Sequence, residues 1–208
     1  MTEAVRLLSG RPPPDLVQPK FFSSNGTDSF LAPSQFTSNR HAWVHVFPEA
    51  CCHQKQDSSL RYFKWGISRL ILESEPAPDF IPMFAHGLQH VMPEDRGWPR
   101  WAPRVGNRIR FAVGEVVNVE ELFGRQRAAW RQLAEKKEMD ALKQDPEAVR
   151  LRVEVAKTVR DEVEKLRESL GLPPEKDHSV ALAETWAEEP KNKRRFKSPV
   201  DGSFINRH

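Results

Sequence analysis

The chain has few of the residues that mark disulfide-rich or metal-binding proteins. It has two cysteines among 208 residues, and they are adjacent, at positions 51 and 52. Neighbouring cysteines cannot staple distant segments, so a disulfide framework is excluded and a reduced, intracellular setting fits best. Cys51, Cys52 and His53 are contiguous, which is not the spacing of a zinc site. We therefore expect no metal ion and no other cofactor.

Long apolar runs and a strong charge of one sign are also missing. No stretch of about 18 apolar residues occurs, so any membrane contact is expected to be interfacial. The formal net charge is only +3, with acids and bases interspersed, which argues against a nucleic-acid partner. The basic run over 191–197 is the exception. A solvated tail is favoured there over contact with anionic lipid or a nuclear-type signal.

One short apolar run ends at a proline and a carboxylate. Residues 43–47 read Trp-Val-His-Val-Phe, which predicts a buried strand. Pro48 ends this strand because proline donates no ladder hydrogen bond. Glu49 is then expected at a strand end, which is where α/β folds place their chemistry. The alternative is that Glu49 only caps a following helix.

The pattern then changes to a helix and to further strands. Residues 61–73 carry apolar side chains at helical spacing, and Pro76 and Pro78 end this helix before a strand near 80–84. Residues 108–117 alternate between polar and apolar, which predicts a strand with one solvated face. The order of elements predicts an α/β domain.

Three blocks of these segments read Phe47-Pro48-Glu49, Phe63-Lys64-Trp65-Gly66 with Arg69-Leu70-Ile71, and Ile81-Pro82-Met83. With these blocks the chain resembles the tafazzin family, in its fungal branch, within the glycerophospholipid acyltransferase superfamily. The resemblance implies a partial acyltransferase-type mixed sheet flanked by helices. It also implies a transacylase that moves acyl chains between phospholipids and lysophospholipids of the cardiolipin type, bound peripherally to mitochondrial membranes.

The general base that this resemblance implies is missing. The family uses a histidine oriented by an aspartate, with four residues between them, ahead of the Phe-Pro-Glu block. Here the only histidines ahead of that block are His41 and His45, and the positions at the matching spacing hold Val46 and Ala50. We therefore predict no catalytic residue and little turnover. We also expect the polypeptide to begin inside a longer ancestral sequence.

A second histidine and aspartate have the family spacing at another place. His90 and Asp95 are separated by four residues, but they follow the Phe-Pro-Glu block and have Pro93 between them. We interpret this pair as a chance match.

The resemblance also assigns the substrate contacts. Ala50 stands where the family has glycine, and its Cβ restricts a backbone with positive φ and a close approach by a headgroup. Basic residues nearby are suited to an anionic headgroup, although charged residues beside a helix are usually only solvated. The predicted substrate-binding residues are Phe47, Pro48, Glu49, Arg61 and Lys64.

Three tryptophans are predicted to anchor the chain at a membrane surface. Trp98 and Trp101 stand in a proline-rich loop between basic residues, and Trp65 lies within the predicted helix. Amphipathic rings of this kind favour the headgroup region. The apolar residues that follow Trp65 in the helix are interpreted as core instead.

The last third of the sequence is helical and charged. One helix is expected from 119 to about 143, and a second begins with Asp145 as N-cap and Pro146 and ends near Gly171. An apolar seam from Val149 to Leu170 is predicted to pack on its own domain, with a partner helix or a membrane surface as alternatives.

The sequence predicts five segments. They are a residual helix over 1–10, a linker or insert rich in Pro, Ser and Asn over 11–39, a partial acyltransferase domain over 40–118, a charged helical extension over 119–172 and a disordered basic tail over 173–208. An open sheet edge in such a partial domain favours self-association.

Three classes of function follow. They are a phospholipid-lysophospholipid transacylase, a catalytically dead fragment that binds anionic membranes or a full-length partner, and a helical interaction protein built on the seam.

Overall fold

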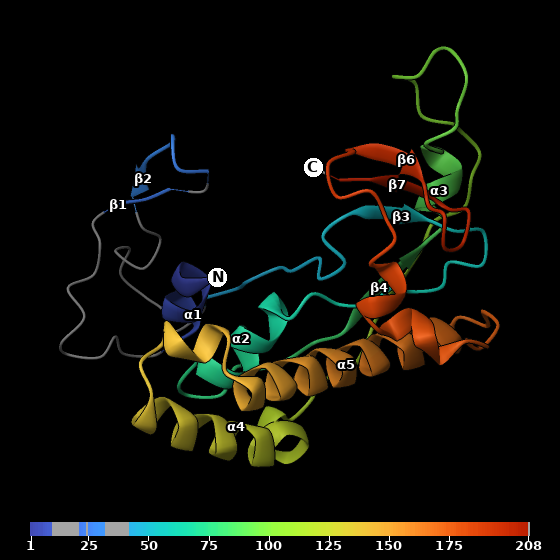
Figure 1. The fold of residues 1–208 in the computed structure, drawn as a ribbon. Helices are drawn as coiled ribbons and strands as arrows, with labels where there is room; N and C mark the ends of the chain where they lie inside the picture. The colour runs from blue at the N-terminus through green and yellow to red at the C-terminus, as the bar shows by residue number, and fades with distance from the viewer. Residues whose placement is uncertain (10–20, 24, 32–41, 208) are drawn as a thin grey trace. The chain divides into compact units, whose positions relative to one another are not determined.

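A computed structural model describes residues 1–9, 21–23, 25–31 and 42–207. Most of the predicted insert over 11–39 lies outside these residues, and its described part includes an antiparallel hairpin of β1 (Phe21–Phe22) and β2 (Phe30–Leu31). The chain divides into two compact units (Figure 1). The first comprises Met1–Val46, Trp65–Phe80 and Asn118–Val155, and the second Phe47–Lys64, Ile81–Val117 and Ala156–His208.

The first unit is mainly helical. Helix α2 (Gly66–Glu73) packs against α1 (Thr2–Leu8) and α4 (Val119–Lys136). The short helix η3 (Ala141–Lys143) and the beginning of α5 (Pro146–Ser169) also belong to this unit. The buried apolar side chains of this unit include Leu70, Ile71, Leu72, Val119, Phe123, Trp130, Leu142, Leu151 and Val155.

Side-chain caps fix where the two long helices begin. The side chain of Asn118 accepts backbone N–H groups of the first turn of α4 at 3.1 and 3.2 Å. Asp145 accepts those of the first turn of α5 at 3.1 and 3.0 Å, and Pro146 follows it with its fixed φ. The predicted start of α5 is thus confirmed. The preceding helix ends at Lys136, before the predicted 143, and η3 follows it.

The second unit contains two antiparallel sheets. Strands β3 (Cys52–Gln54), β7 (Phe204–Asn206) and β6 (Arg195–Lys197) form one, with β7 in the middle. Figure 1 shows how this sheet brings the C-terminal strands beside β3, which lies far earlier in the sequence. Strands β4 (Met83–His86) and β5 (Arg110–Val113) form the other. The short helices are α3 (Leu88–Val91), η4 (His178–Ala181) and η5 (Glu184–Trp186).

Two buried arginines of α5 hold the segment 57–61 by its main chain. Arg160 donates to the carbonyl oxygens of residues 60 and 61 at 2.9 Å each. Arg167 donates to those of residues 57 and 58 at 2.8 and 2.9 Å. Both side chains are about 2% exposed or less, and a buried guanidinium must find acceptors for its N–H groups. These bonds tie the segment to the helix.

The predicted strand over 43–47 is not formed. The segment belongs to none of the described sheets, and Trp43 and Phe47 are 78% and 77% exposed. Side-chain exposure alternates along this segment, as it does in an extended chain, so the sequence correctly indicated an extended backbone. The segment does not pair with a neighbouring strand of the described residues, however, and therefore forms no sheet there. All strand pairs described are antiparallel, so the described residues are α/β with small antiparallel sheets and show no mixed sheet.

The tail predicted to be disordered has regular structure. The region beyond Pro173 forms η4, η5, β6 and β7, and it contributes the buried side chains of Val180, Trp186 and Ile205. Composition suggested disorder because large apolar residues are few there. Val180, Trp186 and Ile205 are nevertheless packed, although Leu182 is 44% exposed, and β7 pairs with β3 on one side and with β6 on the other.

Candidate functional site

The Phe-Pro-Glu block forms a tight turn in the second unit. The N–H of Ala50 donates to the carbonyl of Phe47 at 3.1 Å, and the N–H of Lys64 donates to the carbonyl of Pro48 at 2.9 Å. Ala50 has φ +52°, in the left-handed region that glycine adopts without strain. The turn thus keeps a glycine-type conformation although its residue carries a Cβ.

The carboxylate of Glu49 lies inside this turn, 18% exposed. Burial raises the pKa of Glu49, and the positive charges near it and a hydrogen bond from the main-chain N–H of Arg61 oppose the rise only in part. One carboxylate oxygen is 3.7 Å from Nδ1 of His53. Glu49 therefore holds its proton more readily than an exposed glutamate does, which is a property of acid–base groups.

His53 lies between two carboxylates. Its Nε2 is 3.1 Å from Oδ2 of Asp201, which stands in the turn between β6 and β7, and its side chain is 2% exposed. The ring meets that of Trp186 edge-on at 5.7 Å. Burial acts to raise the pKa of Asp201, but hydrogen bonds from His53 and Ser203 outweigh it and lower that pKa. Asp201 therefore stays ionised, and Asp201, His53 and Glu49 form a row.

Arg61 is held by its neighbours in the same region. Its guanidinium donates to both oxygens of Glu189, the shorter bond being 2.7 Å, and stacks 4.3 Å above the ring of Trp186. Arg207 donates to the same carboxylate at 2.8 Å. Arg61 and Glu189 are 2% and 0% exposed. This buried ion pair therefore belongs to the interior of the second unit.

The two adjacent thiols are poor nucleophiles here. Burial raises the pKa of Cys51 to about 11, and it also raises the pKa of Cys52. The thiolate is the reactive form, so both side chains stay protonated at neutral pH.

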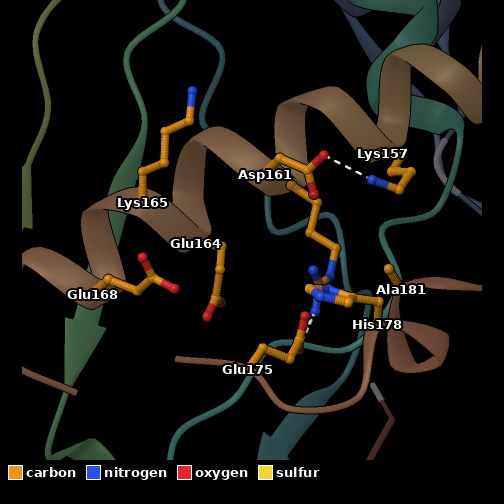
Figure 2. Close-up of a pocket in the computed structure, with 9 residues that line it drawn as sticks. Lys157, Asp161, Glu164, Lys165, Glu168, Glu175, His178 and Ala181 are labelled. Atoms are coloured by element: carbon orange, nitrogen blue, oxygen red, sulfur yellow. Dashed lines mark hydrogen bonds and ion pairs between the residues drawn. The ribbon is translucent and has the colours of Figure 1, made fainter. Parts of the chain in front are cut away.

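The second unit contains an open groove and a smaller cavity. The larger, about 880 Å³, is an open groove with a mostly polar lining that includes Gln54, Asp57, Gln89 and Asp201. Figure 2 shows the smaller one, about 190 Å³, where Asp161 pairs with Lys157 at 2.9 Å along α5 and Glu175 pairs with an arginine of that helix. Among the described residues, no group of three His, Cys, Asp or Glu side chains could hold a metal ion.

The sequence is similar to curated lipid enzymes. A tafazzin of Saccharomyces cerevisiae is 32% identical over 163 residues, which cover 71% of this chain and 42% of the yeast protein. A Dictyostelium discoideum protein named taffazin is 31% identical over 87 residues, 40% of this chain and 29% of that protein. The chain is a homologue of the tafazzins.

The other similarities fit this relationship. An N-acylphosphatidylethanolamine synthase of Arabidopsis thaliana is 31% identical over 81 residues, 38% of this chain and 28% of that protein, which supports the acyltransferase superfamily. No protein-family model matches the chain. The chain spans about two fifths of the length of the yeast tafazzin and less than a third of the other two proteins.

The structure gathers most of the predicted substrate residues around the tafazzin-type turn. Glu49 lies in it, Phe47 and Pro48 begin it, and the main chain of Lys64 closes it. The side chain of Lys64 is exposed. Arg61 is near Glu49 but is buried against Glu189, so its assignment as a headgroup contact stays a prediction that requires the pair to open.

Sequence reasoning missed Asp201, Glu189 and Trp186, and it did not pair His53 with Glu49. His53 stands four residues after Glu49, and that spacing was a usable signal. Nothing local pointed to Asp201 or Glu189, which lie 148 and 128 positions from their partners.

The predicted membrane anchors differ in their surroundings. Trp98 and Trp101 are 89% and 79% exposed in the loop between α3 and β5. The loop is braced by Arg96 and Arg100, whose side chains donate to its own carbonyl oxygens. Trp65 belongs to the first unit, is 43% exposed, and lies beneath the guanidinium of Arg152 at 5.5 Å. The described helices include none that is long and apolar enough to cross a bilayer.

Proposed function

We propose that this chain belongs to a phospholipid-lysophospholipid transacylase system that remodels cardiolipin-type lipids, with monolysocardiolipin as acceptor. The similarity to the yeast tafazzin, over 71% of the chain, is the observation that carries the proposal. The Glu49 turn supplies the acceptor-binding part of a partial acyltransferase scaffold, with Phe47 and Lys64 exposed beside it. The setting is the surface of a mitochondrial membrane, bound peripherally.

The chain by itself turns over slowly. The general base of the family precedes the Phe-Pro-Glu block, and no histidine with an aspartate five positions later precedes that block here. Loss of general-base catalysis costs about 10²–10⁴ in rate. The described row Asp201, His53 and Glu49 does not replace it, because His53 is 2% exposed and both its ring nitrogens face carboxylates.

The test is acyl transfer from a labelled phosphatidylcholine to monolysocardiolipin in vesicles, with the yeast tafazzin assayed in parallel. The expected rate is about a hundredth of the yeast rate or less. A rate equal to that of the yeast enzyme would refute slow turnover. Binding of monolysocardiolipin is measured for two variants. If Lys64→Ala weakens it and Lys176→Ala does not, the result supports the assignment of the Glu49 turn to acceptor binding. Equal binding by both variants overturns it.

A membrane-binding role without turnover is the second candidate. It is favoured by the exposure of Trp98 and Trp101 in a loop that also carries Arg96, Arg100 and Arg104. Aromatic rings and cations suit the headgroup region of an anionic bilayer. Self-association through the edge of a small sheet would assist such binding.

The third class, a helical interaction protein, has less support. The seam of α5 is used inside the protein, because Ala156, Val159 and Val163 are 4%, 2% and 9% exposed. Val153 is the seam position that stays half exposed, at 51%. A partner helix would find little apolar surface there.

A further inference from the structure

A serine and a histidine of the second unit meet outside the Glu49 turn. Oγ of Ser58 is 2.9 Å from Nδ1 of His86, the last residue of β4. Nε2 of Gln89 is 2.8 Å from the same oxygen. None of these three residues belongs to the blocks that carry the family resemblance.

The directions of these hydrogen bonds follow from one unambiguous donor. The backbone N–H of Gly87 donates to Oε1 of Gln89 at 3.0 Å, which fixes the orientation of the Gln89 amide. The Nε2 of Gln89 must then donate to Ser58, so Oγ accepts there. The hydroxyl proton of Ser58 can then point at Nδ1 of His86, and that nitrogen accepts it when the ring carries its proton on Nε2. A general base at this position needs that tautomer.

The surroundings favour this arrangement chemically. Partial burial and the cations Arg110 and Arg167, with His90, lower the pKa of His86. The imidazole is therefore neutral at pH 7 and able to take a proton. The same positive field favours negative charge on the oxygen of Ser58 as its proton leaves.

The backbone at Ser58 is also unusual. Its φ is +54°, in the left-handed region, and its N–H closes a turn onto the carbonyl of Lys55 at 3.1 Å. A residue with a Cβ is strained in this conformation. A glycine would form the turn at lower cost, so the strain points to a use for the hydroxyl.

We propose that Ser58 is a nucleophile, with His86 as its general base, that accepts an acyl group from a carboxylic ester. His86 Nδ1 takes the proton of Ser58 while Oγ forms a bond to the ester carbonyl carbon. The bond from that carbon to the alcohol oxygen then breaks, and the departing alcohol takes the proton back from His86. The products are acyl-Ser58 and a free alcohol. Water or a second alcohol removes the acyl group by the reverse steps.

The open groove of about 880 Å³ lies beside the pair, although Ser58 and His86 are not among its lining residues. Gln89, which bonds the oxygen of Ser58, lines this groove, as do Asp57 and His90 from the residues next to the pair. Its polar lining suits a short acyl group on a polar alcohol better than a long fatty chain. The proposal is independent of the Glu49 turn, because it needs neither the missing upstream base nor a membrane.

The test treats the full chain with an alkyl fluorophosphonate and locates the adduct by peptide mass mapping. The expected result is one adduct per chain, on Ser58. Ser58→Gly removes the hydroxyl and relieves the backbone, so it tests the site without threatening the fold. It should abolish the adduct, whereas Ser59→Ala, which changes the neighbouring serine, should retain it.

His86 is tested by the rate of the same labelling. His86→Gln should slow it at least about tenfold, because the base that accepts the proton is removed. His178→Gln, which changes an exposed histidine of η4 outside the groove, should change it less than about twofold. Incubation with p-nitrophenyl butyrate should leave a butyryl group on Ser58. Labelling that is absent, that survives Ser58→Gly, or that ignores His86→Gln overturns the proposal. None of these outcomes depends on transacylation of phospholipids.

Discussion

Asp201 accepts a hydrogen bond from His53 at 3.1 Å across 148 positions of sequence. The bond joins the turn between β6 and β7 to the strand that follows the Glu49 turn. The C-terminal hairpin thereby becomes part of the candidate site.

Asp201→Asn should lower the stability of the protein at neutral pH. Hydrogen bonds to a charged group contribute about 1.5–3 kcal/mol, and partial exposure places Asp201 at the lower end. The folded state lowers the pKa of Asp201, so this contribution is present above about pH 5 and is lost as the pH falls below the ordinary value. Urea unfolding of both proteins at pH 7 and at pH 3 measures it. Asp95→Asn, an exposed carboxylate, is the control; equal losses in the two variants would contradict the prediction.

Glu49→Gln should raise stability at neutral pH. Because folding raises the pKa of Glu49, its ionised form weakens the folded state above that pKa, and the neutral amide avoids this cost. The gain should shrink as the pH falls and the wild-type carboxyl takes up its proton. Thermal unfolding between pH 4 and pH 8 checks it, with Glu138→Gln as an exposed control. A loss of stability at pH 7 would show that the attraction of His53 and Arg61 outweighs burial.

Ala50→Gly and Ala187→Gly should shift stability in opposite directions. Ala50 has φ +52°, where glycine relieves strain, and a gain of about 0.5–1 kcal/mol remains after the greater freedom of glycine in the unfolded chain. Ala187 has helical φ of −64°, where glycine costs about 0.5–1 kcal/mol. Chemical denaturation of the two variants side by side gives the signs. A loss with Ala50→Gly would mean that the Cβ makes contacts worth more than the strain.

Glu189→Ala should destabilise the second unit strongly. It leaves the guanidinium of Arg61 buried without its carboxylate, and breaking a buried pair in this way costs about 3–5 kcal/mol. The double variant Arg61→Met with Glu189→Leu should lose less, because it removes both charges and keeps apolar volume. A double-mutant cycle by urea unfolding measures the coupling. Additive losses would show that the two residues do not depend on each other.

Trp98→Ala with Trp101→Ala should weaken binding to vesicles that contain cardiolipin by at least about tenfold. Each indole can bury up to about 200 Å² when it enters the headgroup region. The free energy gained by burying that area exceeds the 1.4 kcal/mol that corresponds to a tenfold change in affinity. Flotation with vesicles of graded cardiolipin content measures the change. Trp43→Ala removes an equally exposed tryptophan outside the arginine-rich loop and should leave binding intact. A similar loss with Trp43→Ala would mean that the loop has no special role.

The sequence predicted best what is encoded locally. Asp145 and Pro146 form a cap whose chemistry is complete within four residues, and α5 begins there. The alternation over 108–117 predicted a strand, and β5 forms within it at Arg110–Val113, although Phe111 and Val113 are 68% and 61% exposed. The turn at Glu49 was located by Pro48, although the strand expected before it did not form.

What depends on distant partners could not be predicted. The regular structure of residues 174–207 depends on contacts such as Glu189 with Arg61 and β7 with β3, which no local sequence period encodes. The same holds for the side-chain pairs of the second unit. Asp201 meets His53, and Ser58 meets His86, only in the folded protein.

The arginines of α5 bind the segment 57–61 through main-chain carbonyl groups, which every amino acid has. Substitutions at an outward-facing position such as Asp57 therefore leave that attachment unchanged. The loop can vary its surface chemistry over evolutionary time while the helix keeps it in the same place.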